Sequence, residues 1–284
     1  MAIQQFIPQS NVLPSANFAS LPAASGFPVG WRYNVTDVGT HGSTWASDGA
    51  LWQLVGGIVN LFQNSIPMGI PPSGIITVTT GVLTLGTALD NIYPSIYFWF
   101  PAGAWTGSTA GMYYVVMSST TVGTVYSNQY TGGVATIPSS PTLVTTGAGA
   151  YVQTTGVYNA VLSYTMPAGV MGATGSITSK TLISSNNSTG PKICTPNAGI
   201  TQQLGNFSLT SGLTGRQGYA TSTNVGISRQ STFVLSDSSS SSAASSVIIT
   251  AVNTAAVFNM TPQLFIPTAT DWIILQSYQL ILSR

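Results

Sequence analysis

The chain has very few charged side chains. Of its 284 residues, six are Lys or Arg and five are Asp or Glu, and all five of these acids are aspartate. Charged residues make up 4% of the chain, against about 25% in an average soluble domain. A net charge of +1 without a Lys/Arg cluster provides no basic face for phosphates, which excludes a nucleic-acid-binding protein. Coiled coils and helical bundles are excluded as well, because they need segments rich in Glu and Lys.

Cysteine, histidine and long apolar runs are also scarce. The single Cys194 excludes a disulfide framework within the chain, and with the single His41 it gives no zinc cluster. We therefore expect no bound metal and no cofactor. The longest apolar stretch, residues 50–62, contains Gln53 and Asn60 and is shorter than the roughly 18 residues of a membrane helix. The sequence predicts no membrane insertion, and its start lacks the pattern of a signal peptide.

The residues that are abundant favour β-structure. The chain contains 36 Ser, 37 Thr and 30 Gly, and hydrophobic residues make up 44% of it. Short β-branched and aromatic runs alternate with Gly- and Pro-containing turns along most of its length, which is typical of sandwiches and barrels. We predict an all-β fold whose polar surface consists of hydroxyl, amide and backbone groups.

The clearest local signal is a hairpin near the N-terminus. Apolar and polar residues alternate over residues 31–37, and a second alternating segment contains an Asp-Gly pair. Asp-Gly between strand-like residues predicts a two-residue turn, because both of its residues need positive φ. With Asp48 and Gly49 as the turn, Trp45 would lie directly opposite Trp52. Residues 31–54 are therefore predicted to form a three-stranded meander.

The distribution of Pro, Gly and Ser suggests the domain organisation. Residues 1–30 carry four prolines and no periodicity, which predicts an extended arm ordered by a partner. Residues 31–135 are predicted to be a small β domain, residues 136–150 a linker, and residues 151–284 a β-sandwich resembling a jelly roll. The last strand, near residues 271–283, is long and apolar, so we expect it to be central in a sheet or covered by another subunit.

Few residues could carry out catalysis. Asp37, His41 and Ser43 lie within seven residues of each other, but a triad also needs a buried Asp and an oxyanion hole. A Gly-rich turn explains the same residues. Asp90 and Asp271 are the carboxylates left without an evident turn or strand-end role, and glycoside hydrolysis needs a pair of carboxylates. We expect no catalytic residues and keep a polysaccharide depolymerase as the least favoured alternative.

Aromatic residues could instead contact a sugar. Trp105 lies between Gly103-Ala104 and Thr106-Gly107, in a segment that has the composition of a loop. We therefore predict that Trp105 is exposed and is the best candidate for contact with a glycan. Core packing is the alternative for this residue and for each of the other five tryptophans.

Two segments resemble virion proteins of tailed bacteriophages. The first is WRYNVTDVGTHGSTWASDGALW at residues 31–52, and the second is FPAGAWTGSTAGMYYVVMSSTTVGTVYSNQYTGG at residues 100–133. The C-terminal half is similar to the β-sandwich modules that close phage fibres. The resemblance covers most of the chain but consists of short, loosely matching segments. It transfers no catalytic residue.

The resemblance implies a virion component that is trimeric and attaches to the particle through its N-terminal region. We expect a non-enzymatic tail fibre or spike, with residues 1–30 binding other virion proteins. The C-terminal sandwich would then face a glycan or protein of the host surface. A capsid decoration or head-fibre protein is the alternative structural role. An almost uncharged surface fits either role, because its stability does not depend on salt and its faces associate readily with further copies.

Overall fold

The computed structural model describes residues 12–39, 42–55, 57–77, 80–145, 147, 149–198, 202–203, 206–209, 211–212, 214–224, 230–237, 247–250 and 252–284. Within these ranges the fold is all-β, as the sequence predicted. The described strands form three sheets. Helical structure in the same ranges is limited to two 3-10 turns, η1 (Phe18–Ser20) and η2 (Ala24–Gly26).

A small N-terminal sheet contains the predicted meander. Its order is β1-β2-β3-β4, formed by β1 (Val12–Ala16), β2 (Arg32–Val35), β3 (Ser43–Ser47) and β4 (Trp52–Leu54). The antiparallel pairs β2–β3 and β3–β4 confirm the three-stranded meander. Strand β1, in contrast, pairs in parallel with β2.

The predicted arm at residues 1–30 is wrong for residues 12–30. Strand β1 and the two 3-10 turns belong to the N-terminal sheet and its cover. Ala24 is buried, and the Phe18 ring packs 4.6 Å from the Trp45 ring. Pro22 and Pro28 follow the two 3-10 turns, whereas Pro14 lies within β1. Phe18 and Phe27 supply apolar contacts to the sheet. Residues 1–11 lie outside the described residues.

A large sheet runs through the rest of the molecule. Its order is β12-β7-β8-β11-β10-β9-β6-β23-β15-β19-β20-β21, with β5 also pairing with β23. Its strands are β5 (Ile58–Asn64), β6 (Met68–Ile70), β7 (Gly74–Ile76), β8 (Val82–Leu85), β9 (Ile96–Phe100), β10 (Gly111–Met117), β11 (Val122–Gln129), β12 (Ala150–Tyr151), β15 (Ser176–Ser185), β19 (Gly215–Asn224), β20 (Gln230–Asp237), β21 (Val247–Thr250) and β23 (Ile273–Ser283).

The last strand is central, as its apolar sequence predicted. One edge of β23 pairs with β15 over ten residue pairs, and the other pairs with β5 and then β6. Leu280 and Leu282 are fully buried. Neither edge of this apolar strand is therefore free to aggregate.

A second, smaller sheet packs on the large one. It has the order β13-β22-β16-β17, with β14 on β22 and β18 on β16. The Phe207 ring of β18 packs directly against Gly218 of β19. A Cβ added to Gly218 would lie 2.5 Å from this ring. This close approach shows a two-layer, sandwich-like core. The jelly-roll connectivity stays a prediction. The strands are β13 (Asn159–Ala160), β14 (Tyr164–Met166), β16 (Lys192–Ala198), β17 (Gln202–Gln203), β18 (Phe207–Leu209) and β22 (Phe258–Phe265).

Strand pairing does not follow the predicted boundary at residues 136–150. Strands β5 and β6, from the predicted N-terminal domain, pair with β23 at the C-terminus. The predicted linker lies along β11, because Leu143 bridges Tyr126 and the Val144 amide donates to the Val125 carbonyl. A segment with the composition of a linker therefore packs here alongside a strand of the large sheet.

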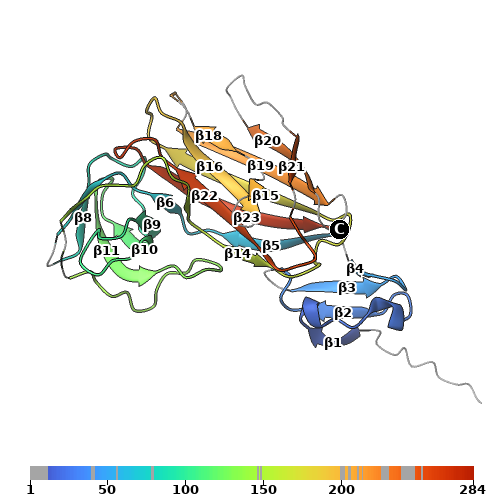
Figure 1. Ribbon diagram of the computed structural model, residues 1–284. Coiled ribbons are helices and arrows are strands. Elements are labelled where there is room, and N and C mark those ends of the chain that lie inside the picture. Colours follow the sequence, from blue (N-terminus) through green and yellow to red (C-terminus); the bar gives the residue numbers. More distant parts are fainter. Residues whose placement is uncertain are drawn as a thin grey trace, which may run out of the picture.

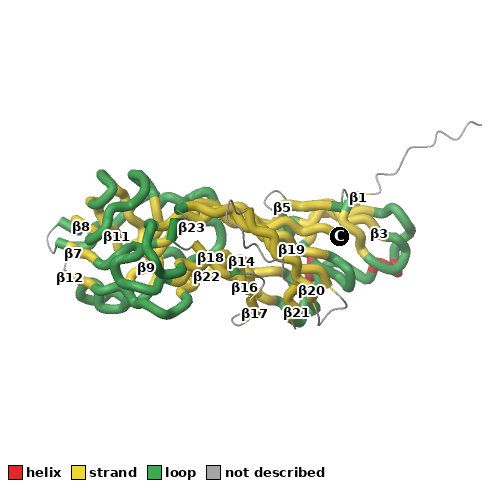
Figure 2. The backbone as a smooth tube through the Cα atoms, turned by 90° about the horizontal axis from the view of Figure 1, so that it is seen from above, coloured by secondary structure: helices red, strands yellow, loops and turns green. Residues whose placement is uncertain are grey.

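The molecule is elongated, with the N-terminal sheet at one end. Strands β7 to β11 lie at the opposite end, and the sandwich occupies the middle (Figure 1). The view from above shows the same order along the long axis (Figure 2). The C-terminus lies next to the N-terminal sheet, on the side of β4 (Figure 1).

The central position of β23 predicts how two neighbouring substitutions differ. Leu280→Ala removes a fully buried side chain between the sheets and should lower the free energy of unfolding by about 2–5 kcal/mol. Ile281 lies on the opposite face of the same strand and is partly exposed. The substitution Ile281→Ala should therefore lower the free energy of unfolding clearly less than Leu280→Ala does. Chemical denaturation of both variants measures the difference. Equal losses would contradict this assignment of the faces.

Candidate functional site

The hairpin after β3 forms, but its register differs from the prediction. Trp45 pairs with Leu54, and Ser47 pairs with Trp52, so the pairing is displaced by two residues. Of the two predicted turn residues, Gly49 has a positive φ of +92° and Asp48 does not. The predicted direct pairing of Trp45 with Trp52 is therefore wrong. Because the displacement is two residues, both indoles still lie on the same face of the sheet.

The Asp48 side chain accounts for the shifted turn. Its Oδ1 accepts hydrogen bonds from the amides of Ala50 (2.9 Å) and Leu51 (2.7 Å), and its Oδ2 accepts one from Gln53 Nε2 (2.8 Å). These bonds, led by that of Leu51, lower the pKa of Asp48 to about 2. The carboxylate stabilises a loop that places Gly49 at the turn. We call residues 48–51 the hairpin tip.

Aromatic rings fill the face of the N-terminal sheet behind the tip. Trp52 packs 5.2 Å from Tyr33 and 5.6 Å from Phe27, and its Nε1 donates to the Pro22 carbonyl. Trp45 is fully buried. Both predicted tryptophans are thus core residues that fix the segment before β2 on the sheet.

An open groove of about 320 Å³ lies beside the hairpin tip. Most of its lining is apolar. The residues are Phe18, Leu21, Pro22, Ala23, Ala24, Ala50, Leu51, Trp52 and Arg284. Leu51 is 56% exposed on the rim, and Val29, 74% exposed, lies next to Gly49. We call this space the tip groove.

Arg284 is the one charged residue that lines the tip groove. Its guanidinium carbon lies 5.1 Å from the centre of the Trp45 ring. A Cβ on Gly172 would lie 2.7 Å from the same guanidinium, so Gly172 permits the close approach. Burial lowers the pKa of Arg284, which the charge of Asp48 opposes. Within the described residues its Nη1 has no hydrogen-bond partner.

The prediction that Trp105 is exposed is wrong. Its side chain is 6% exposed and packs 4.6 Å from the Tyr113 ring and 5.5 Å from the Phe100 ring. The loop folds back over the sheet because the Thr106 amide donates to the Gly147 carbonyl at 2.8 Å. Trp105 therefore presents no platform for a glycan.

The aspartates considered for hydrolysis do not form an open pair. Asp271 is 1% exposed, while Asp90 is exposed and accepts a 2.6 Å hydrogen bond from the Tyr93 hydroxyl. Asp37 accepts a 2.7 Å hydrogen bond from the Phe18 amide. His41, the central member of the considered triad, lies outside the described residues.

A buried polar cluster missed by sequence reasoning surrounds Asp271. Asn186 Nδ2 donates to its Oδ1 at 2.9 Å, and Asn186 Oδ1 accepts from the Trp272 amide. Lys192, fully buried, donates from Nζ to the carbonyl and hydroxyl of Ser188. Burial lowers the pKa of Lys192. Burial also raises that of Asp271, but hydrogen bonds and the charge of Lys192 lower it overall. The cluster joins the loop between β15 and β16 to the segment that leads into β23.

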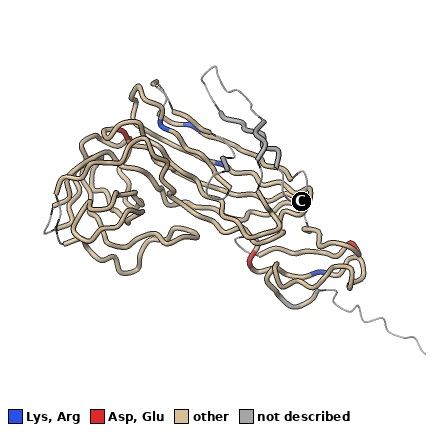
Figure 3. The backbone as a smooth tube through the Cα atoms, in the orientation of Figure 1, with Lys and Arg blue, Asp and Glu red and all other residues tan. Residues whose placement is uncertain are grey.

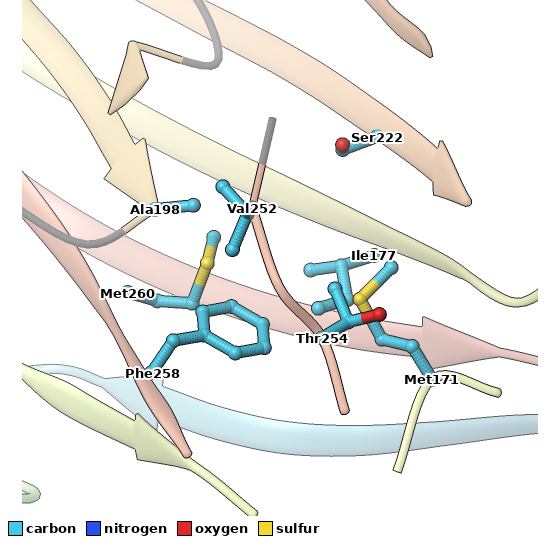
Figure 4. A pocket seen from close by; sticks show the side chains of 8 residues that line it. All are labelled: Met171, Ile177, Ala198, Ser222, Val252, Thr254, Phe258 and Met260. Atoms are coloured by element: carbon cyan, nitrogen blue, oxygen red, sulfur yellow. The ribbon is translucent and has the colours of Figure 1, made fainter. Parts of the chain in front are cut away.

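A small cavity of about 10 Å³ lies in the sandwich. Its lining comes from several segments, with Met171, Ile177, Phe258 and Met260 around it (Figure 4). A space of this size holds at most a single water. We interpret it as a packing void, because it has no room for a ligand.

The described residues contain neither a cluster of metal ligands nor a membrane-spanning helix. They contain no group of three His, Cys, Asp or Glu side chains placed to hold a metal ion. None of the helices within the described ranges is long and apolar enough to cross a bilayer.

Comparison with known proteins matches no family model and no curated sequence. The tip groove is therefore the candidate site.

The role of Asp48 predicts a pH dependence of stability. Its pKa in the fold, about 2, lies below the ordinary 3.8, so it stabilises the fold above that ordinary value and the stabilisation is lost as pH falls toward 2. The wild type should therefore lose more thermal stability than Asp48→Asn between about pH 5 and pH 2. Gln53→Ala keeps the carboxylate and should retain most of the dependence. Equal slopes for wild type and Asp48→Asn would contradict the tip assignment.

Proposed function

We propose that the chain is a non-enzymatic structural protein of a bacteriophage virion. It would form a homotrimeric tail-fibre or spike-type appendage that contacts the host surface. The proposal joins the phage-like segments of the sequence to one structural observation. Large apolar side chains are exposed on a chain along which charged residues are sparse (Figure 3).

The exposed apolar side chains carry this proposal. Seven of those described are more than half exposed, and charged residues make up only 4% of the sequence. Isolated exposed apolar residues are ordinary, but a nearly uncharged surface does not oppose association. These side chains would be buried between copies. They are Val29, Leu51, Ile58, Ile75, Ile137, Val152 and Val257.

The use of the aspartates supports a structural role. Asp37, Asp48, Asp90 and Asp271 each accept hydrogen bonds that hold a loop or turn. Carboxylates that act mainly as hydrogen-bond acceptors in this way are less sensitive to salt than a surface ion-pair network. Low sensitivity to salt suits a virus particle, which meets changing salt concentrations outside the cell.

The elongated shape supports an appendage with two distinct ends. The N-terminal sheet lies at one end and strands β7 to β11 at the other (Figure 1). In the proposal the N-terminal region, including residues 1–11, binds other virion proteins. The sandwich and the opposite end then face the host, where a surface glycan or protein is the partner.

The molecular mass in solution tests the assembly. Light scattering after size exclusion should give about three times the chain mass of 29.4 kDa, and the trimer should persist in high salt because few ions hold it. A 29.4 kDa species at micromolar concentration would contradict the proposed trimer.

Binding to cells and to particles tests the location. Labelled protein should bind cells of the host and should compete with infection. Binding to capsids without binding to cells would contradict the appendage and favour a decoration protein. Release of reducing ends from host capsule would instead establish a depolymerase.

A further inference from the structure

The buried cluster around Asp271 holds two of the few ionisable side chains of this chain. Charged residues make up only 4% of the sequence, yet Lys192 is 0% exposed and Asp271 is 1% exposed. Removing an amine and a carboxylate from water is unfavourable unless their contacts compensate for it. Two such groups inside a nearly uncharged protein therefore call for a chemical reason.

Asn186 places a carboxamide against the buried carboxylate. Its Nδ2 donates to Asp271 Oδ1 at 2.9 Å, and its Oδ1 accepts from the Trp272 amide at 3.1 Å. The Trp272 amide would stabilise negative charge that develops on Oδ1 when the carbonyl carbon is attacked. The carboxylate is placed to return a proton to Nδ2 as this nitrogen leaves. The carboxamide of Asn186 is thus held as an electrophile.

The Lys192 amine is held on the same loop. Its Nζ donates to the Ser188 carbonyl at 3.1 Å and to the Ser188 hydroxyl at 2.9 Å. Ser188 in turn lies close to Asn186, because its backbone amide donates to the Asn186 carbonyl at 3.1 Å. Burial lowers the pKa of Lys192, so its neutral, nucleophilic form is more accessible than that of an exposed lysine.

Ser188 connects the amine to the carboxylate. Its hydroxyl contacts Lys192 Nζ, and its interaction with Asp271 lowers the pKa of that carboxyl. The hydroxyl both donates and accepts hydrogen bonds. It therefore provides a path for a proton from the amine to the carboxylate, which itself contacts Asn186 Nδ2.

We propose that Lys192 and Asn186 react to form an intramolecular isopeptide bond. A rotation of the flexible Lys192 side chain brings the neutral Nζ from Ser188 to Asn186 Cγ. The Nζ–Cγ bond then forms and the Cγ–Nδ2 bond breaks. One proton passes from Nζ through Ser188 Oγ to Asp271, which delivers it to Nδ2. An amine and a carboxamide thereby become a new amide and ammonia, so the step needs no oxidant, reductant or cofactor.

The bond gives the chain a covalent link that its cysteine content cannot provide. Cys194 is the single cysteine, so a disulfide within the chain is excluded. The isopeptide bond closes the loop between β15 and β16, beside the segment that leads into β23. Neither salt nor reductant breaks an amide. This inference is independent of the proposed trimer.

The mass of the folded wild-type protein tests the bond directly. It should be lower than the sequence mass by the mass of one ammonia. Trypsin cleaves after free lysine and should not cleave after Lys192, so residues 181–216 should remain one peptide that carries the same mass loss. A wild-type protein with the full sequence mass, cleaved after Lys192, would overturn the proposal.

Substitutions in the cluster test which groups react. Lys192→Met and Asn186→Ala should both show their full sequence mass. Asp271→Asn removes the proton carrier and should leave most chains unlinked. Asn187→Ala is the matched control, because Asn187 Oδ1 accepts from the Gly212 amide and has no part in the reaction. This variant should keep the loss of one ammonia.

A cyclic imide at Asn186 gives the same loss of mass and has to be distinguished. An imide forms without the lysine, so the loss would persist in Lys192→Met, and trypsin would still cleave after Lys192 in the wild type. An imide also hydrolyses in mild alkali, whereas an isopeptide bond persists. Either imide result would overturn the proposal. The mass of one chain does not depend on assembly, so neither outcome affects the proposed function.

Discussion

The pairing of β23 is the constraint on which the rest of the structure depends. This last strand receives β15 on one edge and β5 and β6 on the other, so it joins two parts of the chain that lie far apart in the sequence. Its inner face supplies Tyr278, Leu280 and Leu282 to the main core, while Ile274 belongs to the core at the far end. Both halves of the molecule are therefore completed only when the final strand is in place.

Hydrogen bonds to aspartate and asparagine side chains order several of the described loops. Asp48 closes the hairpin tip, the Tyr93 hydroxyl connects Asp90 to Gln276 of β23, and Asn186 ties Asp271 to the Trp272 amide. Each bond fixes a loop at the end of a strand. A chain with 4% charged residues can in this way order its loops without the surface charges that would keep its copies apart.

Sequence reasoning succeeded where the signal was local. Alternation predicted the meander of β2 to β4, and the apolar run near the C-terminus predicted a central strand. The hairpin register was missed because the Asp48 carboxylate, and not the backbone preference of Asp-Gly, sets the turn. Trp105 was misplaced because its Gly-containing flanks look like an open loop. The rings that cover it, Phe100 and Tyr113, lie on separate strands.

Non-local pairing was beyond the reach of the sequence. Strand β16 contains Pro196, a residue that ordinarily interrupts the hydrogen-bond ladder of a strand. In the fold Pro196 lies opposite Pro262 of β22, so neither strand has an amide donor at that pair and none is left unsatisfied. The domain boundary failed for the same reason, because no local pattern shows that β5 and β6 pair with the last strand. The tip groove also joins three distant segments, ending with Arg284.

Amide hydrogen exchange in the native state tests the central role of β23 most directly. If this strand completes both halves, its amides should exchange only through global unfolding, with the highest protection in the molecule. The amides of β2 to β4 should exchange no more slowly than those of β23. Rapid exchange along β23, while β9 and β10 remain protected, would show that the halves fold without it and would contradict the account.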